Sequence, residues 1–254
     1  LWSVVALILL FGMIISSLWY AFRQKRNAEK ALRMLSEARE AFFTNVTHEF
    51  RTPLTVILGV GNELQNKTFN ADKQREAGDM ITRQGNRLLT LVNQMLDISK
   101  VKSAIGEQPR VKADLAAYVE MIVETHRELA RQKNINIIYR TDEGGIDVVF
   151  VADYVDKLVS NLLTNAVKFT PEGGDVSVSA WEISKDDKKT GHYEIRVKDS
   201  GIGMSEEFSK KVFEAFEREK NSTVSGIQGT GLGMSITKSI VDLMGGEIIL
   251  NTAK

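Results

Sequence analysis

The chain is 254 residues long, of which 43% are hydrophobic and 26% charged, a composition typical of folded domains rather than of disordered segments. Its 33 basic residues balance its 33 acidic ones, so no overall field draws the protein to nucleic acid, and we expect no direct nucleic-acid contact. The absence of cysteine excludes disulfides and thiolate metal sites, and the three histidines are too few for a histidine-rich metal centre.

The first 22 residues contain no charged side chain. At ~1.5 Å per residue, a helix of this length crosses the roughly 30 Å hydrocarbon core of a bilayer, which predicts a transmembrane helix over residues 1–22. Trp2, Trp19 and Tyr20 lie near its two ends, as in interfacial aromatic belts, and basic residues follow at 23–26. A cleaved signal peptide is the alternative, but no basic segment precedes the apolar run. We therefore expect the residues after about 22 to be cytoplasmic and, because the sequence opens on Leu1, to belong to a longer protein.

Residues 27–101 show the heptad spacing of two paired helices. Between them, residues 66–72 are polar and indicate a turn, which predicts an antiparallel helical hairpin over residues 37–101. One hairpin leaves apolar stripes uncovered, so we expect a parallel homodimer in which two hairpins form a four-helix bundle. The alternative is a hairpin that packs on the C-terminal region of its own chain. The seam positions are Leu32, Leu35, Phe42 and Val46 in the first helix, and Ile81, Gln84, Leu88, Leu91, Met95 and Ile98 in the second.

A linker at residues 103–110 separates the hairpin from a region of mixed periodicity. Asp114 is placed to cap a helix that continues to residue 132. Apolar alternation predicts strands at residues 135–139, 148–151, 176–183 and 193–198, and further helices are expected at 153–169 and 231–244. Residues 248–251 resemble another strand, so we expect a closing element to be missing. The pattern predicts an α+β layer with helices over one sheet face.

His48 lies in the first hairpin helix, beside Glu49 and close to Pro53. A lone helical histidine is usually a surface residue, but proline inside a helix removes a hydrogen bond, here to the carbonyl of Glu49, at a cost of ~3 kcal/mol. Tolerated strain of this kind gathers at functional sites. A neutral imidazole can attack phosphorus in line, a neighbouring carboxylate such as Glu49 can fix its tautomer, and Thr52 lies one turn away to position a water. His48 is therefore the candidate nucleophile.

Asn161, Asn165 and Lys168 share one face of the predicted helix 153–169, at spacings of four and three. This face presents two carboxamides and an ammonium together, and carboxamide oxygens suit a hard cation such as Mg²⁺, which usually keeps waters and substrate phosphates as its other ligands. A solvated helix face is the competing interpretation.

Glycines cluster in DSGIG at residues 199–203, directly after a strand, and in GTGLG at residues 229–233, which opens a helix. Glycine lets a ligand approach the backbone closely, and a helix start offers free N–H groups to phosphates. The long separation does not fit the dinucleotide-binding βαβ fingerprint. The polar stretch 205–228 is expected to act as a lid.

Together these segments resemble the sensor histidine kinases, over residues 42–250. Residues 47–54 (THEFRTPL) are similar to the phosphoacceptor box of that family, 161–169 (NLLTNAVKF) to its asparagine box and 212–216 (VFEAF) to its phenylalanine box. Residues 199–203 and 229–233 are similar to its two glycine boxes. Residues 43–51 also resemble the hybrid kinases of the Bacteroidetes.

The resemblance implies a dimerising phosphotransfer hairpin followed by an ATP-binding domain of the fold shared with gyrase, Hsp90 and MutL (the Bergerat or GHKL fold), an α/β two-layer sandwich. The expected domains are a transmembrane helix (1–22), a signalling coiled-coil linker (23–41), a dimerisation and phosphotransfer domain (42–102), a linker (103–110) and a catalytic ATP-binding domain (111–254) truncated at its C-terminus.

The resemblance also implies roles for single residues. Asp199 would bind the adenine amino group, Asn165 the Mg²⁺ ion, and Asn161 and Lys168 the phosphates of ATP. Phe169 stands where tyrosine is common in the family. The expected nucleotide-binding set is Asn161, Asn165, Lys168, Phe169, Asp199, Gly201, Gly203, Gly229, Thr230, Gly231, Leu232 and Gly233.

The implied activity is ATP-dependent autophosphorylation of His48 at the bacterial inner (cytoplasmic) membrane, followed by transfer of the phosphoryl group to an aspartate of a response regulator. Glu49 and Thr52 would serve removal of phosphate from that regulator. Whether the phosphoryl group moves within one subunit or across the dimer stays open.

Two other functions compete with this one. A hydrolytic ATPase of the gyrase type needs a carboxylate base, and Asn161 occupies the corresponding helix position. A non-enzymatic membrane scaffold with a decayed nucleotide domain would not need Asn165, Asp199 and the glycines to be intact. Both alternatives are therefore less favoured than a histidine kinase.

Overall fold

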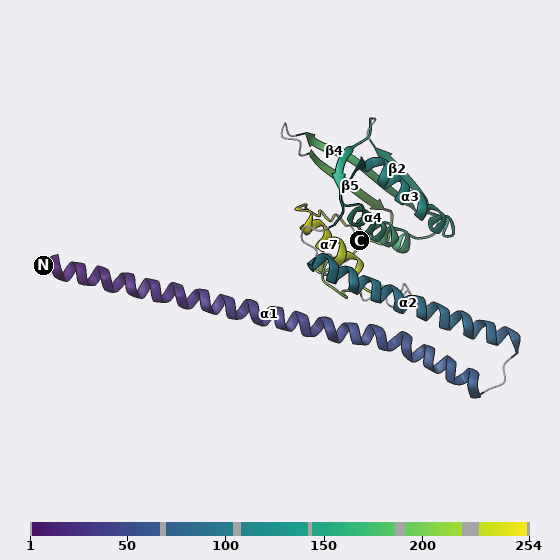
Figure 1. Cartoon of the computed structure of the whole chain (residues 1–254), viewed down its shortest axis with the longest axis horizontal. Helices are drawn as coiled ribbons and strands as arrows, with labels where there is room; N and C mark the ends of the chain where they lie inside the picture. Colours follow the sequence, from purple (N-terminus) through teal and green to yellow (C-terminus); the bar gives the residue numbers. More distant parts are fainter. Residues whose placement is uncertain are drawn as a thin grey trace. The chain divides into compact units, whose positions relative to one another are not determined.

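The computed structural model describes residues 2–66, 70–103, 108–141, 144–185, 191–219 and 229–252. The backbone divides into two compact units, Leu1–Val56 and Ile57–Lys254. The first unit is the N-terminal part of one long helix, α1 (Trp2–Asn66). The second holds the end of α1, the helix α2 (Ala71–Ser103) and an α/β domain (Figure 1).

Helices α1 and α2 agree with the predicted pair of hairpin helices. α1 ends at Asn66 and α2 begins at Ala71, within the polar stretch predicted to turn. α1 is continuous from Trp2, so the predicted coiled-coil linker and the first hairpin helix are parts of one helix. It also continues through Pro53, because the single missing backbone hydrogen bond leaves the neighbouring turns in place.

Within the described residues, no helix is long and apolar enough to cross a membrane, so the transmembrane helix predicted at residues 1–22 finds no support here. The side chains of residues 3–9, inside that predicted segment, lie outside the described set.

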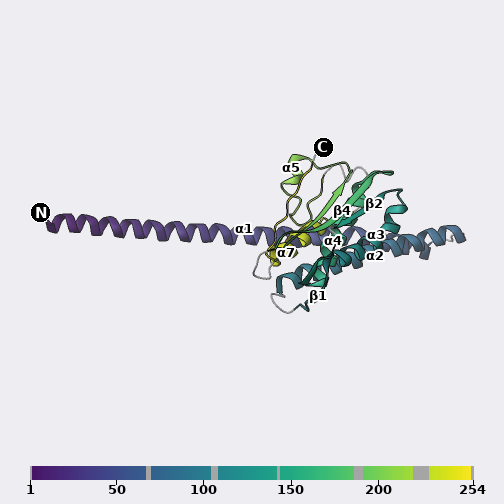
Figure 2. The ribbon, with the colours of Figure 1, turned by 90° about the horizontal axis from the view of Figure 1, so that it is seen from above.

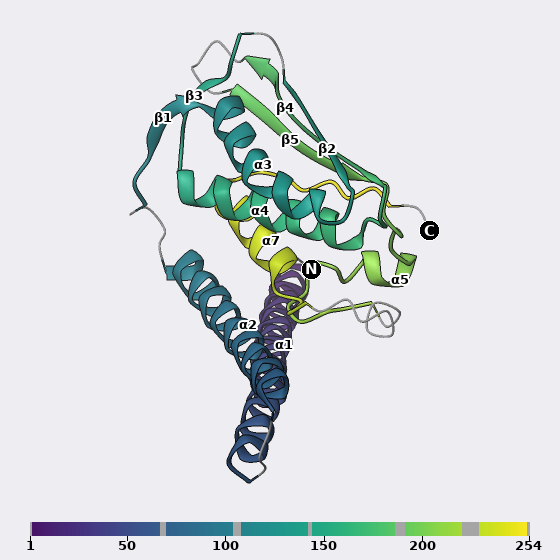
Figure 3. The ribbon, with the colours of Figure 1, turned by 90° about the vertical axis from the view of Figure 1, so that its right-hand side faces the viewer.

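The α/β domain contains two sheets and a layer of helices. A two-stranded antiparallel sheet pairs β1 with β3, and a three-stranded sheet has the order β2-β4-β5, with β2 parallel and β5 antiparallel to β4. Helices α3 and α4 cover one face of the larger sheet, and α7 lies beside α4 (Figure 3). The elements are β1 (Val111–Asp114), α3 (Leu115–Arg131), β2 (Asn136–Thr141), β3 (Asp147–Phe150), α4 (Ala152–Phe169), β4 (Asp175–Lys185), β5 (Gly191–Asp199), α5 (Glu206–Ser209) and α7 (Gly233–Leu243).

The core follows from two periodicities in the sequence. In β4, Val176, Val178 and Ala180 are fully buried and alternate with serines, as expected for a strand with one face in the core. In α4, Val159 and Leu163 lie one turn apart and are also fully buried. Burying side chains of this size contributes roughly 1.5–3 kcal/mol each, so the face of α4 opposite its asparagines is fixed on the sheet.

Asp114 is the N-cap of α3, as predicted. Its carboxylate accepts backbone hydrogen bonds from Ala116 and Ala117 at the helix start and, at 2.9 Å, from Ile146 in the loop before β3. These donors, with Ile146 the strongest, hold the pKa of Asp114 below its ordinary value against the opposing effect of burial. One side chain therefore ties α3 to the segment that leads into β3.

Two features of this domain differ from the sequence prediction. Strand β1 was not predicted; it forms by antiparallel pairing with β3, a partner 36 positions later in the sequence that local spacing does not reveal. Residues 246–252 form no strand, since a strand needs a neighbour to supply its hydrogen bonds. They lie instead beside α5, a short helix in the predicted lid, and the Met204 amide donates to the Thr252 hydroxyl at 2.9 Å (Figure 2). Residues 104–107 of the predicted linker, 186–190 between the predicted strands 176–183 and 193–198, and 220–228 of the predicted lid lie outside the described residues.

Candidate functional site

The phosphoacceptor segment is an exposed part of α1. His48 is exposed, and Glu49 is half-buried one position on. The Thr52 hydroxyl donates to the backbone carbonyl of His48 at 3.3 Å, one of several threonine-to-carbonyl bonds along this helix. Such a bond uses the hydroxyl proton and leaves the oxygen lone pairs free to accept from a water. This hydrogen bond ties the Thr52 side chain to the backbone of His48. Its position agrees with the predicted role of Thr52 in positioning a water.

In the other unit, the polar face of α4 meets the second glycine segment at two points. The Asn161 carboxamide donates to the carbonyl of Gly233 at 3.4 Å, and a Cβ added at Gly233 would lie 3.4 Å from the Asn161 oxygen. Two turns further along α4, the Lys168 ammonium occupies the space that a side chain at Gly229 would need. Residues 229–233 thus run along the α4 face that carries Asn161, Asn165 and Lys168, and their N–H groups open helix α7.

The first glycine segment is held against the C-terminal end of α4, next to the contact between Lys168 and Gly229. The Asp199 carboxylate accepts the Gly201 amide at 2.9 Å, and the Ile202 amide donates to the carbonyl of Phe169 at 3.3 Å. A Cβ at Gly201 would lie 2.9 Å from that carbonyl, so no larger residue fits without movement. The exposed Asp199 and the end of the asparagine helix are therefore neighbours, as one nucleotide site requires.

Phe216 and Gly231 join the two sides of the predicted lid. The Phe216 amide donates to the Gly231 carbonyl at 3.0 Å, and both residues have positive φ, 68° and 73°. A Cβ at Gly231 would lie 2.7 Å from the Phe216 Cα. A phenylalanine in the left-handed region costs of order 1–3 kcal/mol, and such strain persists only where the surroundings enforce it. We call this pair of contacts the clasp. It holds Phe216, the last residue of the phenylalanine box, against Gly231 in the second glycine segment.

Lys168 belongs to a cluster of three cationic side chains, together with Lys133 and Arg218. Of the three, the sequence predicted only Lys168 as a site residue. Its ammonium lies over the Phe169 ring, 4.6 Å from the centroid, and Lys133 donates to the carbonyls of Val167 and Lys168 at 3.2 Å. Burial, followed by the positive charges of Arg218 and Lys133, lowers the pKa of Lys168 to about 8. A bound anion would relieve the repulsion among these cations, so the cluster is a candidate site for phosphate groups.

Lys133 and Arg218 were not predicted as site residues. Lys133 is 35 positions from Lys168 and follows α3, so no spacing connects the two. Arg218 lies two positions after the phenylalanine box, a closeness that is the signal in the sequence that could have drawn attention to it.

A Mg²⁺ site on the polar face of α4 would depend on Asn165. In the described part of the chain, no cluster of three or more histidine or carboxylate side chains is placed to hold a metal ion. Asn165 lies one turn after Asn161 on the polar face of α4 and is half-buried. A carboxamide oxygen suits Mg²⁺ when phosphates and waters complete its shell, so the residues present fit a metal that arrives with a nucleotide.

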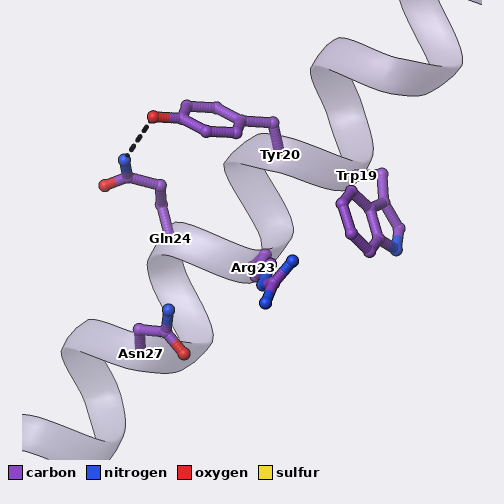
Figure 4. A pocket seen from close by; sticks show the side chains of 5 residues that line it. All are labelled: Trp19, Tyr20, Arg23, Gln24 and Asn27. Carbon is purple, nitrogen blue, oxygen red and sulfur yellow. Dashed lines mark hydrogen bonds between the residues drawn. The ribbon is translucent and has the colours of Figure 1, made fainter.

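Two surface hollows lie outside the predicted nucleotide set. One, of about 310 Å³, lies on α1 between Trp19 and Asn27, where Arg23 stacks over the Trp19 ring and Gln24 donates to the Tyr20 hydroxyl at 2.8 Å (Figure 4). The other, of about 540 Å³, is lined by residues of the α5 region and of the C-terminal segment. Neither contains a residue of the predicted catalytic or nucleotide-binding sets.

Two family profiles match the chain in tandem. One, described as His Kinase A (phospho-acceptor) domain, matches residues 38–104 and includes His48. The other, described as Histidine kinase-, DNA gyrase B-, and HSP90-like ATPase, matches residues 151–254 and includes both glycine segments. The chain belongs to the sensor histidine kinases. The limits predicted for the individual domains of this sensor histidine kinase stay predictions.

Individual relatives agree with this family. The virulence sensor protein BvgS of Bordetella bronchiseptica is 30% identical over 91% of this chain and 19% of its own length. Histidine kinase P4 of Formosa agariphila is also 30% identical, over 91% of this chain and 16% of its own, and is a hint, no more, of a Bacteroidetes origin. A crystal structure of full-length ShkA in complex with AMPPNP matches with 27% identity and a TM-score of 0.56 over 80% of this chain and 40% of that one. The chain spans between 15% and 41% of the length of such curated relatives, and 19% of BvgS.

Replacing Gly231 by alanine tests the clasp of this sensor histidine kinase. We expect Gly231→Ala to lower the free energy of unfolding by about 3 kcal/mol, because left-handed strain of about 1 kcal/mol adds to a clash with Phe216. Gly245→Ala is the matched control, since Gly245 has φ +72° and nothing within 4 Å of an added Cβ. Urea unfolding followed by circular dichroism compares the two, and equal destabilisation would contradict the clasp.

Proposed function

We propose that this chain is the kinase core of a two-component sensor, which transfers the γ-phosphoryl group of ATP to His48 and then to an aspartate of a response regulator. The observation that carries the proposal is the double contact of α4 with the second glycine segment, Asn161 with Gly233 and Lys168 beside Gly229. It builds a phosphate cradle of backbone amides, carboxamides and a cation, in a chain that also exposes His48 on α1. The match to the family of histidine kinase-like ATPases supports ATP as the nucleotide.

The proposed transfer needs little beyond positioning and charge. The neutral His48 imidazole supplies a lone pair, a nitrogen–phosphorus bond forms as the bond between the γ-phosphorus and the bridging oxygen breaks, and ADP leaves. Lys168, Arg218 and Lys133 supply positive charge to the phosphates, and Glu49 holds the imidazolium that develops. Bound through Asn165, Mg²⁺ would neutralise part of the phosphate charge.

Dephosphorylation of the regulator is the proposed second activity of the His48 turn. It requires a water directed at an aspartyl phosphate. The Thr52 oxygen, held at the level of His48 by its bond to the backbone, can accept a hydrogen bond from such a water, and the Glu49 carboxylate lies in the same turn.

Labelling with γ-³²P-ATP and Mg²⁺ tests the proposed transfer. We expect the full chain to acquire label that is labile in acid and stable in base, and we expect His48→Gln to abolish it. His126→Gln and His192→Gln, which replace the other two histidines of the chain, are matched controls and should keep the label. Phosphate release without labelled protein would instead indicate a hydrolytic ATPase, and label that survives in His48→Gln would exclude His48 as the acceptor.

The pKa of Lys168 predicts a pH dependence of ATP binding. With a pKa of about 8, Lys168 loses its charge as the pH rises from 7 to 9 in the free protein, whereas bound phosphates stabilise the charged form. Affinity should therefore fall above pH 8, approaching tenfold per pH unit, and binding should take up protons there. Isothermal titration calorimetry in buffers of different ionisation enthalpy measures this uptake. Lys168→Arg keeps the charge and should flatten the profile, while wild-type protein without uptake at pH 8.5 would contradict Lys168 as a phosphate ligand.

We also propose that the chain acts as a homodimer. Leu58 on α1 and Leu89, Val92 and Leu96 on α2 belong to the hairpin and are 40–58% exposed in the single chain. Such side chains are the expected content of a helix–helix interface between two copies. Light scattering should give twice the mass of the chain, and a monomer at micromolar concentration would contradict the proposal.

A place at the bacterial cytoplasmic membrane, with residues after about 22 in the cytoplasm, is part of the same proposal. It is supported by the lack of charge in residues 1–22 and by exposed apolar side chains on the described part of that segment, Phe11, Met13 and Leu18 among them. Extraction of cell membranes with alkaline carbonate should leave the full chain in the pellet, and release into the supernatant would count against the anchor.

A further inference from the structure

Helix α4 ends beside both glycine segments, and its last turn leaves carbonyl groups that the helix itself does not bond. In a continuing helix the N–H of residue 171 would bond the carbonyl of Val167, but Pro171 has no N–H. The Thr170 amide still bonds the carbonyl of Ala166, at 3.0 Å, as the helix ends. The carbonyls of Val167 and Lys168 therefore need donors from outside α4.

One side chain serves both of these carbonyls. The Lys133 ammonium, in the turn that follows α3, donates to the carbonyls of Val167 and Lys168, each at 3.2 Å. A positive charge at the C-terminal end of a helix is also favoured by the helix dipole. Next to it, the Asn134 carboxamide donates to the Glu172 carboxylate at 2.6 Å. The segment after α3 therefore holds both the last turn of α4 and the turn that follows it.

The turn that Lys133 holds is the one that contacts the two glycine segments. The carbonyl of Phe169 accepts the Ile202 amide of the first segment at 3.3 Å. The Lys168 ammonium occupies the space that a side chain at Gly229, in the second segment, would need. Because Lys168 and Phe169 are consecutive residues of one helical turn, a shift of that turn would disturb both contacts.

We propose that Lys133 is a positioning residue of the nucleotide site, which fixes the last turn of α4 and thereby the place of Lys168 among the phosphates. This inference rests on the proposed function. The two hydrogen bonds of the Lys133 ammonium go to backbone carbonyls. Beyond the charge that it adds to the cationic cluster, Lys133 therefore acts on the nucleotide through Lys168.

Nucleotide affinity gives the first test. In the full chain, we expect Lys133→Met to weaken binding of AMPPNP with Mg²⁺ about tenfold at pH 7, as measured by isothermal titration calorimetry, because two charge-assisted hydrogen bonds are lost. Lys133→Arg keeps a donating cation and should bind within threefold of wild type. Lys238→Met is the matched control, since it removes an ammonium whose partner, Asp242, lies on the same helix α7, and it should bind within twofold. Equal weakening by Lys133→Met and Lys238→Met would overturn the proposal.

A double-variant cycle shows whether Lys133 acts through Lys168. If it does, Lys133→Met should weaken binding about tenfold in wild type and less than twofold in Lys168→Met, because the group that it positions is already absent. A residue that bound the phosphates directly, or that merely supported the fold, would weaken binding by the same factor in both backgrounds, and this result would overturn the proposal. If Lys133→Met fails to fold, as judged by circular dichroism, Lys133→Gln replaces it in both backgrounds.

The pH dependence gives a readout that a purely structural role would not change. The charged groups that act on Lys168 are Arg218 and Lys133, and the second glycine segment brings only the backbone of Gly229 to it. Removing the positive charge at residue 133 should raise the pKa of Lys168, so more of Lys168 stays charged at high pH. The weakening in Lys133→Met should therefore shrink from about tenfold at pH 7 to about fourfold at pH 9. An equal factor at both pH values would overturn the proposal.

Two outcomes for the wild-type protein separate this inference from the proposed function. Wild-type protein that binds AMPPNP but acquires no label on His48 would overturn the proposed transfer, and the variants would still decide the role of Lys133 in binding. Wild-type protein that binds no AMPPNP would overturn both.

Discussion

The two-sided character of α4 is the constraint on which the rest of the nucleotide-binding domain depends. One face of this helix buries Val155, Val159 and Leu163 against the sheet and α3. Because successive turns repeat every 3.6 residues, the opposite face is then obliged to carry Asn161, Asn165 and Lys168 outward. The apolar side thus fixes the direction in which the polar side points. A rotation of α4 that moved the asparagines would have to expose fully buried side chains, at roughly 1.5–3 kcal/mol each.

Glycine residues allow the two glycine segments to pack closely against neighbouring backbone around the polar face of α4. Gly201 lies against the carbonyl of Phe169, and Gly231 lies against the backbone of Phe216, in positions where a Cβ would meet backbone atoms at 2.9 Å and 2.7 Å. Backbone cannot move aside as a flexible side chain can, so the requirement for glycine is steric at both places. The two glycine segments therefore meet near the C-terminal end of α4, the first against Phe169 and the second beside Lys168 and Asn161, and packing and hydrogen bonds hold them there.

The sequence predicted those features that depend on local chemistry. The cap at Asp114, the alternation in β4 and the shared face of α4 follow from spacing alone, and the structure has each of them. It could not predict features that depend on distant pairing. Strand β1 pairs with the distant strand β3, residues 248–251 belong to no strand among the described residues, and the Lys133 ammonium, just after α3, donates to carbonyls of α4. The roles of single site residues, such as Asp199 and Asn165, came from family resemblance and stay predictions.

The packing of α2 shows why a heptad pattern identifies an interface without naming its partner. Leu91 was expected to face another helix of the bundle, and it is indeed buried, but α2 also packs on α7 of the same chain. An apolar residue at a heptad position indicates that this side of the helix is covered, but it does not identify the element that covers it. The polar residues beside the seam are more selective, because a buried or half-buried hydrogen bond requires a particular partner. Gln94 and Asp97 have such partners in Thr230 and Lys157, and so distinguish this packing from a generic helix contact.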